Sequence, residues 1–324
     1  MNRTLVRLLQ AKTAKLRERG IAWQITGVAS RSLGWMAKPQ GFDSSALVKG
    51  ELSAASLMAT STRDVREWLH AARADVLFEA TSLNVLNGQP AIDHIRAALA
   101  AGAHAITANK GPVAHAYEEL RALARSKGLS FLFESTVMDG APIFSLFRDS
   151  LPAVHLRGFR GILNSTTNVI LGAMEEGMDF AGALKKAQEI GVAETDPAHD
   201  IEGWDATVKV AVLINVLMEE KIALTTIRRE GIGRLSGEAV RAARASGNPY
   251  KLVCRAQRNE AGIQASVGPE QVPLSDPLAW VAGTSSIVYF ETDMFPGLTI
   301  AETHPGLEAT AYGMLADFIH AASN

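Results

Sequence analysis

Only one cysteine occurs in the 324 residues of this sequence, and neither sign of charge prevails. The single thiol, Cys254, excludes an internal disulfide and a cluster of thiolate metal ligands, and it is typical of proteins in a reducing compartment. Because 34 acidic residues balance 32 basic ones, no basic surface is expected to hold a phosphate backbone. We therefore expect a cytoplasmic protein without a nucleic-acid partner.

Long hydrophobic runs are also missing. The longest apolar stretch, residues 210–218, is interrupted by Asn215 and is about half of the ~20 residues that a membrane span needs. The basic residues near the amino terminus flank no apolar core, so neither a signal peptide nor a membrane partner is expected. What is present is a 47% hydrophobic composition, which predicts two domains or one large α/β unit for a chain of this length.

Strand and helix patterns alternate in the first part of the chain. Helical patterns cover residues 2–19, 62–72, 91–101 and 115–127, strand patterns cover 21–29, 75–80, 105–108 and 129–133, and a polar loop covers 40–56. This order is typical of a Rossmann-like parallel sheet with helices on both faces. Ligands of such sheets bind beyond the carboxyl ends of the strands, here residues 30–32, 81–84 and 107–110.

The regular alternation of strand and helix patterns ends after Glu134. Strand patterns occur at residues 156–163, 252–256 and 262–267, and helical patterns at 183–190, 206–218 and 308–321. Neighbouring strands that are not separated by helices predict an α+β domain for this half.

The densest charged segment is residues 191–212, GVAETDPAHDIEGWDATVKVAV. It carries five carboxylates and one cation, namely Glu194, Asp196, Asp200, Glu202, Asp205 and Lys209. Asp205 and Lys209 are four residues apart on one helix face, and the apolar neighbours of Lys209 predict that it is at least partly buried. A lysine beside carboxylates can move a proton while the carboxylates bind an ammonium group. A solvated surface ion pair is the alternative that this spacing alone favours.

Two polar segments follow predicted strands. In TANKGP, residues 107–112, Lys110 either stands at the edge of the sheet beside a cofactor or substrate or is an ordinary exposed lysine. In GILNSTTN, residues 161–168, Asn164, Ser165 and Thr166 either cap a helix or present backbone N–H groups to a carboxylate.

In their order along the chain, these segments resemble the homoserine dehydrogenase family. The resemblance is carried by EATSLN (79–84), HAITANKGPVA (104–114), FESTV (133–137), GILNSTTN and residues 191–209, and more weakly by DPLAWVAGTSS (276–286) and TAYGMLADF (310–318). It implies a cytoplasmic, homodimeric oxidoreductase of threonine and methionine biosynthesis that interconverts aspartate 4-semialdehyde and homoserine with NAD(P). It implies a nucleotide-binding domain over 1–133, a catalytic and dimerisation domain over 134–300, and a helix over 301–324 that returns to the first domain. Neither an aspartokinase domain nor a regulatory amino-acid-sensing domain is expected.

The resemblance also implies roles for individual residues. Lys209 and Lys110 take the places of the family's two functional lysines. Substrate contacts fall on Glu194, Asp205, Asp200 and Thr166. Cofactor contacts fall on Ser30, Arg31, Thr81, Ser82, Lys110 and Gly191. A monovalent cation such as Na⁺ would bind Glu134 and the backbone carbonyls of Val137, Asp139 and Ala141.

Several positions depart from the family pattern. The family's first strand and G-x-G-x-x-G loop precede its first helix, whereas that helix begins at residue 2 here, so we expect the true start about 10–15 residues upstream. Met138 and Asp139 replace part of a glycine-rich stretch, Ser165 replaces a glycine, and Val192 stands where many members have tyrosine. Residues 304–306, His-Pro-Gly, replace the family's glycine-rich nicotinamide loop.

The end of the second expected strand indicates the cofactor. An acid at this point would bind the ribose 2′-hydroxyl of NAD, whereas Arg31 beside Ser30 suits a 2′-phosphate and favours NADP. Two rival functions stay open: an oxidoreductase of the same fold with a different hydroxy acid or aldehyde, and a non-catalytic homologue unable to bind dinucleotide. Cysteine-dependent reduction of an acyl phosphate is not expected, because Cys254 lies within a predicted strand without a neighbouring histidine.

Overall fold

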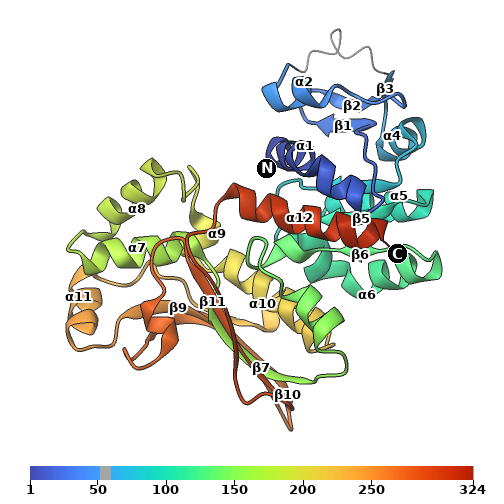
Figure 1. Cartoon of the computed structure of the whole chain (residues 1–324). Helices are drawn as coiled ribbons and strands as arrows, with labels where there is room; N and C mark the ends of the chain where they lie inside the picture. Colours follow the sequence, from blue (N-terminus) through green and yellow to red (C-terminus); the bar gives the residue numbers. More distant parts are fainter. Residues whose placement is uncertain (52–59, 324) are drawn as a thin grey trace. The chain divides into compact units, whose positions relative to one another are not determined.

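The computed structural model describes residues 1–51 and 60–323 and divides the chain into two compact units (Figure 1). Unit 1 comprises Met1–Pro142 and Gly306–Asn324, and unit 2 comprises Ile143–Pro305. The functional boundaries expected at residues 133 and 300 stay a prediction.

Unit 1 is built on a parallel sheet, as the alternating pattern predicts. Its strands lie in the order β4 (Val76–Glu79), β5 (His104–Thr107) and β6 (Phe131–Leu132). The helices α5 (Ala91–Ala101) and α6 (Lys110–Ser126) connect them in turn. α6 begins five residues before the expected helix, because the side chain of Asn109 caps it by accepting a hydrogen bond from the Gly111 N–H.

Helices cover both faces of this sheet, which confirms the expected α/β class. α1 (Asn2–Glu18) and α12 (Leu307–Ala322) share one core with Ile106 and Leu132 of the sheet, and Val76 and Phe78 pack against it. α4 (Val65–Ala72) and α5 share another core with Leu77. Because successive side chains of β4 alternate between these two cores, the cores lie on opposite faces.

A small antiparallel sheet precedes β4, and two sequence predictions fail there. Its strands are β1 (Gly27–Ser30), β2 (Gly34–Ala37) and β3 (Thr60–Thr62). The strand expected at 21–29 begins only at Gly27, since no ladder partner adjoins residues 21–26 in the described part of the chain. The expected loop at 40–56 contains α2 (Ser44–Lys49), capped by Asp43 and ended by Gly50 in the left-handed conformation. Residues 52–56 of that expected loop lie outside the described residues.

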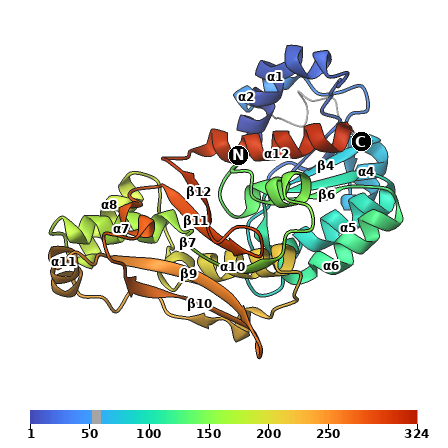
Figure 2. The same cartoon turned by 60° about the horizontal axis from the view of Figure 1, so that its bottom comes forward.

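Unit 2 contains a mixed six-stranded sheet, which confirms the α+β pattern (Figure 2). The strand order is β12 (Leu298–Glu302), β11 (Ser286–Thr292), β7 (Leu156–Ile162), β9 (Tyr250–Asn259), β10 (Gly262–Gln271) and β8 (Arg228–Arg229). The helices are α7 (Ser165–Glu175), α8 (Phe180–Glu189), α9 (Ala198–Ile201), α10 (Trp204–Leu217) and α11 (Gly237–Ala245). Short helical turns are η1 (Glu134–Thr136) in unit 1 and η2 (Leu146–Ser150), η3 (Leu224–Thr226) and η4 (Pro277–Trp280) in unit 2.

The apolar helix α10 packs against β9 and β10, and α7 packs against β9 beside it. Residues of α10 such as Val208, Val210 and Val212 are fully buried, so the helix fixes the position of the few polar residues that it carries. Among the described residues, no helix combines the length and the apolar character that crossing a membrane requires.

Candidate functional site

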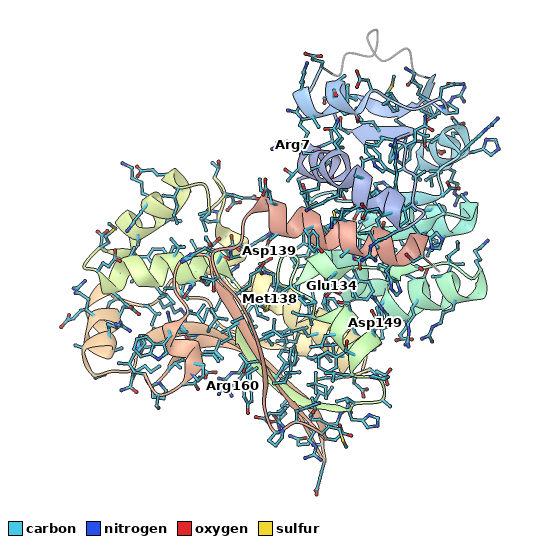
Figure 3. The ribbon with its side chains drawn as sticks, in the orientation of Figure 1. Arg7, Glu134, Met138, Asp139, Asp149 and Arg160 are labelled. Carbon is cyan, nitrogen blue, oxygen red and sulfur yellow. The ribbon has the colours of Figure 1, made fainter. Side chains whose placement is uncertain are left out.

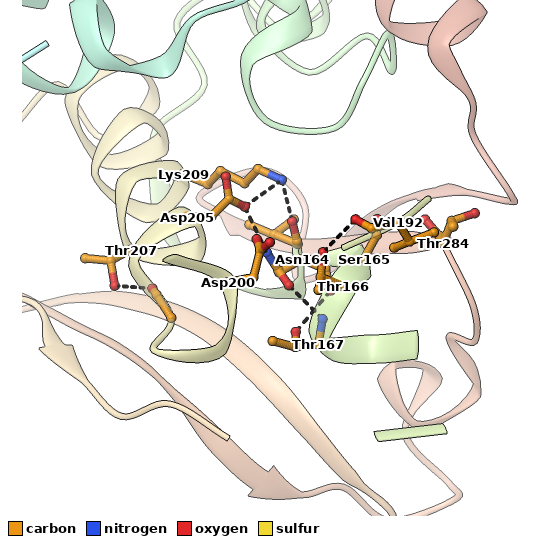
Figure 4. Close-up of polar contacts among 12 residues, drawn as sticks. Asn164, Ser165, Thr166, Thr167, Val192, Asp200, Asp205, Thr207, Lys209 and Thr284 are labelled. Atoms are coloured by element: carbon orange, nitrogen blue, oxygen red, sulfur yellow. Dashed lines mark hydrogen bonds and ion pairs between the residues drawn. The ribbon is translucent and has the colours of Figure 1, made fainter. Parts of the chain in front are cut away.

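The centre of the site is Asn164, which connects three segments that are far apart in the sequence (Figure 4). Asn164 is the N-cap of α7, and its side-chain oxygen accepts a hydrogen bond from the Thr167 N–H at 2.9 Å. Its side-chain amide donates to Asp200 Oδ1 at 2.6 Å and to Asp205 Oδ2 at 3.1 Å. The capping role expected for this segment is therefore present, and the same side chain also holds two carboxylates in one place.

Lys209 completes this cluster from the next turn of α10. Its Nζ lies 3.3 Å from Asp205 Oδ2 and donates to the Leu163 carbonyl oxygen at 2.6 Å. The Lys209 and Asp205 side chains are only 16% and 17% exposed, which excludes the solvated surface pair. Two fixed acceptors thus orient a partly buried ammonium group beside two carboxylates.

Burial raises the pKa of the Asp200 carboxyl, and the neighbouring charge of Asp205 raises it further. The hydrogen bond from Asn164 and the charge of Lys209 oppose this rise without cancelling it. Asp205 lies in the first turn of α10, where the helix dipole favours a negative charge. The cluster therefore concentrates negative charge in a partly buried place, a setting that attracts a small cation such as an amino-acid ammonium group.

Thr166 and Glu194 differ in their relation to this cluster. Thr166 is 5% exposed, and its hydroxyl donates to the Val192 carbonyl oxygen at 3.1 Å, so it fixes the segment in front of α9. Glu194 is exposed, and its backbone carbonyl accepts a hydrogen bond from the Gln188 side chain at 3.2 Å. The structure thus joins Asp200, Asp205, Thr166 and Lys209 through Asn164 and its neighbours, and it leaves the Glu194 carboxylate on the surface.

Cys254 lies beneath this cluster, in the middle of β9 as expected. Complete burial raises the pKa of its thiol to about 12, against an opposing effect of Lys209. A thiolate is the nucleophilic form of cysteine, so this residue takes no part in covalent catalysis at neutral pH.

The cofactor residues expected in unit 1 lie at the carboxyl ends of its strands. Thr81 and Ser82 follow β4 and are exposed, and Lys110 opens α6 after β5. The buried Glu79 carboxylate accepts from the Thr81 N–H and the Thr107 hydroxyl, both at 2.8 Å, so it ties the two strand ends together. This is the edge of a parallel sheet at which a dinucleotide binds, and the residues present fit one.

Ser30 and Arg31 lie at the exposed end of β1, in the turn before β2. The Ser30 hydroxyl accepts a hydrogen bond from the Leu33 N–H at 3.1 Å, which fixes the turn that carries Arg31. Gly191 belongs to unit 2, where it follows α8 in the left-handed conformation.

The segment expected to hold a monovalent cation packs against α12 (Figure 3). Asp139 adopts a positive φ of 41°, a conformation that aspartate tolerates, and its carboxylate accepts from the Thr310 hydroxyl at 2.6 Å. A Cβ at Gly140 would collide with the Ala309 carbonyl oxygen of α12. The departure at Met138 and Asp139 therefore leaves a sharp turn in place. In the described residues no cluster of three His, Cys, Asp or Glu side chains could hold a metal, so a cation here would depend on backbone carbonyls.

Asn164 is the residue that sequence reasoning left as a simple helix cap. Its contacts with Asp200 and Asp205 span 36 and 41 residues, and no local pattern shows such a contact. The available signal was an asparagine at a predicted helix cap in a chain that also carries a segment with five carboxylates and one lysine.

We expect Asp200→Asn to leave the protein at least as stable as the parent at pH 8. The folded-state pKa of Asp200 is raised, so its ionised form costs stability above that pKa, and the cost disappears as the pH falls towards its unfolded value near 4. The variant should therefore melt at the same or a higher temperature than the parent at pH 8, with the difference shrinking at pH 5. Thermal melts across this range test it, and a lower melting temperature at pH 8 would contradict it.

Comparison with known proteins gives a consistent result for both parts of the chain. Residues 142–319 match the family described as "Homoserine dehydrogenase", and residues 2–134 match "Homoserine dehydrogenase, NAD binding domain". The NAD(+)-dependent homoserine dehydrogenase of Pseudomonas canavaninivorans is 35% identical, over 99% of this chain and 93% of its own length. The homoserine dehydrogenase of Methanocaldococcus jannaschii is 38% identical, over 76% of this chain and 72% of its own. A crystal structure of a putative homoserine dehydrogenase from Archaeoglobus fulgidus superposes with a TM-score of 0.86 at 28% identity, over 98% of this chain and 95% of that one.

Proposed function

The chain belongs to the homoserine dehydrogenase family of oxidoreductases, and from this premise we propose that its unit 2 cluster binds the amino acid and moves the proton of the reaction. The carrying observation is the partly buried lysine held between Asp205 and the Leu163 carbonyl, beside the Asp200 carboxyl. Lys209 is the group for proton transfer, and Asp200 and Asp205 are the groups for the substrate ammonium.

The charges in the cluster indicate the role of each residue. In aldehyde reduction, hydride adds to C4 of aspartate 4-semialdehyde, and protonated Lys209 donates a proton from Nζ to the carbonyl oxygen. In homoserine oxidation the same Nζ takes that proton back. When bound, the nicotinamide cofactor supplies or accepts the hydride. Asp205 and the Leu163 carbonyl orient Nζ, and Thr166 holds the Val192 backbone in front of the cluster.

Two departures from the family pattern, at Ser165 and Val192, support a second candidate function, in which the substrate is a different hydroxy acid or aldehyde. The Ser165 hydroxyl donates to the Thr284 carbonyl oxygen at 3.1 Å, so the residue that replaces a glycine tethers a loop beside α7. Val192 supplies no phenol where many members of the family carry tyrosine. A panel of hydroxy acids and aldehydes, compared by kcat/KM with homoserine and aspartate 4-semialdehyde, separates these candidates. If turnover is absent and homoserine does not shift the melting temperature, the proposal fails and the non-catalytic alternative stands.

Cofactor choice is proposed from the exposed turn at Ser30 and Arg31. An arginine at this edge suits a 2′-phosphate, which favours NADP, whereas the relative from Pseudomonas canavaninivorans is named as NAD(+)-dependent. We expect Arg31→Ala to raise the KM for NADP⁺ about 10-fold or more, since a charge-assisted hydrogen bond to phosphate contributes about 1.5–3 kcal/mol, and to leave the KM for NAD⁺ within about twofold. Arg73→Ala, at another exposed arginine of unit 1, is the control. Equal changes in both KM values would remove the argument.

The remaining roles are proposals of the same kind. Lys110, Thr81 and Ser82 are proposed to contact the cofactor at the edge of the unit 1 sheet, and Gly191 keeps its own proposed role as a cofactor contact. Glu134 and the carbonyls of Val137, Asp139 and Ala141 form an all-oxygen donor set, which suits a hard cation such as Na⁺. The homodimer is proposed from the family resemblance. The cytoplasmic location rests on the single cysteine.

A further inference from the structure

Ser286, the first residue of β11, carries a buried hydroxyl that differs from its polar neighbours. The residue is 7% exposed, and among the described residues its Oγ has no hydrogen-bond partner. Ser285 shows the ordinary case, since its hydroxyl accepts a hydrogen bond from the His304 N–H at 3.1 Å. A buried hydroxyl without a partner lowers stability, so a protein retains one where an ordered water or a ligand supplies the missing contact.

Strand pairing places the Ser286 side chain on the face of the sheet that carries the Lys209 cluster. Alternate residues of a strand share a face, so Ser286 points the same way as Val288. Val288 pairs with Gly161, which pairs in turn with Cys254 of β9. Cys254 lies close enough to Lys209 for the charge of the lysine to act on its thiol. The Ser286 hydroxyl and the Lys209 cluster are therefore on the same side of the sheet.

Ser286 also lies one strand away from the backbone that orients Lys209. Ile287 pairs with Ile162, so the residue before it, Ser286, lies opposite Leu163. Directly opposite residues of an antiparallel pair are about 5 Å apart. The Leu163 carbonyl oxygen is the acceptor to which Lys209 Nζ donates at 2.6 Å. A small ligand that contacts Lys209 is thus within reach of the Ser286 hydroxyl.

The chain that enters β11 is held in place by side chains of α7. The Ser165 hydroxyl donates to the Thr284 carbonyl oxygen at 3.1 Å, and the Asn168 side-chain amide donates to the Gly283 carbonyl oxygen at 2.9 Å (Figure 4). The N-cap of this same helix holds the two carboxylates of the cluster. One helix therefore fixes both the cluster and the segment that carries the buried hydroxyl, and a donor fixed in advance is the kind that stabilises developing charge.

The charge beside Ser286 indicates which oxygen of a ligand it can meet. Glu302 of β12 pairs with Ser286, and a carboxylate at this neighbouring position disfavours an anionic group. The α-carboxylate of the substrate is therefore a poor partner for the hydroxyl. The neutral alcohol or aldehyde oxygen at C4 is a suitable one.

From this geometry we propose that the Ser286 hydroxyl donates a hydrogen bond to the C4 oxygen of the substrate, as a second donor beside Lys209. The inference rests on the proposed function of the unit 2 cluster. In aldehyde reduction Lys209 supplies the proton and Ser286 keeps its own, so the hydroxyl stabilises the negative charge that develops on the oxygen as hydride adds to C4. Ser286 then recognises the oxygen that distinguishes homoserine from an amino acid that lacks it.

Ser286→Ala tests the proposal, because alanine removes only the hydroxyl. We expect kcat for homoserine oxidation to fall about 10²-fold, the effect of losing one fixed donor to a developing oxyanion. The melting temperature of the free protein should stay the same or rise, since an unsatisfied buried group is removed. The matched control is Ser266→Ala on β10, which pairs with Arg255 on the opposite face and should change neither quantity.

A ligand without the C4 oxygen makes the result specific. L-2-Aminobutyrate is homoserine without that oxygen, and calorimetric titration gives the Kd of both ligands. Ser286→Ala should weaken homoserine binding about 5-fold and leave the Kd of L-2-aminobutyrate unchanged. Equal weakening of both ligands, or an unchanged kcat in a parent chain that oxidises homoserine, would overturn the proposal. Turnover by the parent chain and its loss in Lys209→Ala test the proposed function separately, so the two failures are distinguishable.

Discussion

Replacing Lys209 with alanine is expected to lower kcat by about 10²–10⁴-fold while the protein stays folded, since this is the range that positioned proton transfer contributes. The Nζ of Lys209 is the only group in the cluster that both carries a proton and lies fixed between Asp205 and the Leu163 carbonyl in the described structure. Alanine removes the proton donor but leaves both carboxylates and Asn164. The KM for homoserine should therefore change far less than kcat, because the proposed ammonium contacts, Asp200 and Asp205, are both retained.

Steady-state rates of homoserine oxidation, with NADP⁺ and with NAD⁺, measure this effect. The matched control is Lys186→Ala. Lys186 of α8 forms an exposed ion pair with Glu176, and the loss of this pair should leave kcat and the melting temperature unchanged. Near-normal turnover in Lys209→Ala would end the assignment of Lys209. A loss of activity that comes with unfolding would be seen in the melt, and Lys209→Arg then retains the charge for a second comparison.

Local rules predicted the parts of the site that lie within one helix. The apolar neighbours of Lys209 predicted its partial burial, whereas the four-residue spacing from Asp205 alone favoured a solvated surface pair. The role of Asn164 in the cluster was not predicted, because its contacts with Asp200 and Asp205 depend on how β7, α9 and α10 are packed. Glu194 shows the opposite case, since it belongs to the same acidic segment and yet lies exposed.

The fold was predictable where a pattern is long and periodic. α5, α10 and α12 and the strands of the parallel sheet lie close to their expected positions, because burial of one face dictates each pattern. Residues 21–26 carry a strand pattern, but a strand needs a ladder partner, and no strand of the described part of the chain pairs with them. α2 was missed because its six residues are defined by the Asp43 cap and Gly50 rather than by an apolar stripe.

Replacing Lys251 with methionine is expected to lower the free energy of unfolding by about 2–4 kcal/mol, without affecting Lys209 directly. Lys251 is 4% exposed on β9, and its Nζ donates to the Val281 carbonyl at 2.7 Å and to Asn168 Oδ1 at 3.2 Å. Methionine fills a similar volume but leaves both acceptors without this donor. The nearby Glu175 also loses a cation, although its second partner, Arg244, stays 3.7 Å away.

The pH dependence distinguishes this buried lysine from an ordinary one. Burial lowers the pKa of Lys251 despite the opposing charge of Glu175, so the folded protein binds this proton less tightly than the unfolded chain does. The contribution of Lys251 to the free energy of unfolding must then rise as the pH increases from the lowered pKa towards the pKa of the unfolded chain, which is near 10.4. Urea titrations between pH 7 and pH 10 should show this rise in the parent protein and its loss in Lys251→Met. The control is Lys185→Met, at an exposed lysine. Glu175→Gln combined with Lys251→Met should recover part of the stability, because the double variant no longer holds a carboxylate that has lost this cation. If Lys251→Met matched the parent protein at every pH, Lys251 would be a solvated side chain whose contacts contribute nothing to the fold.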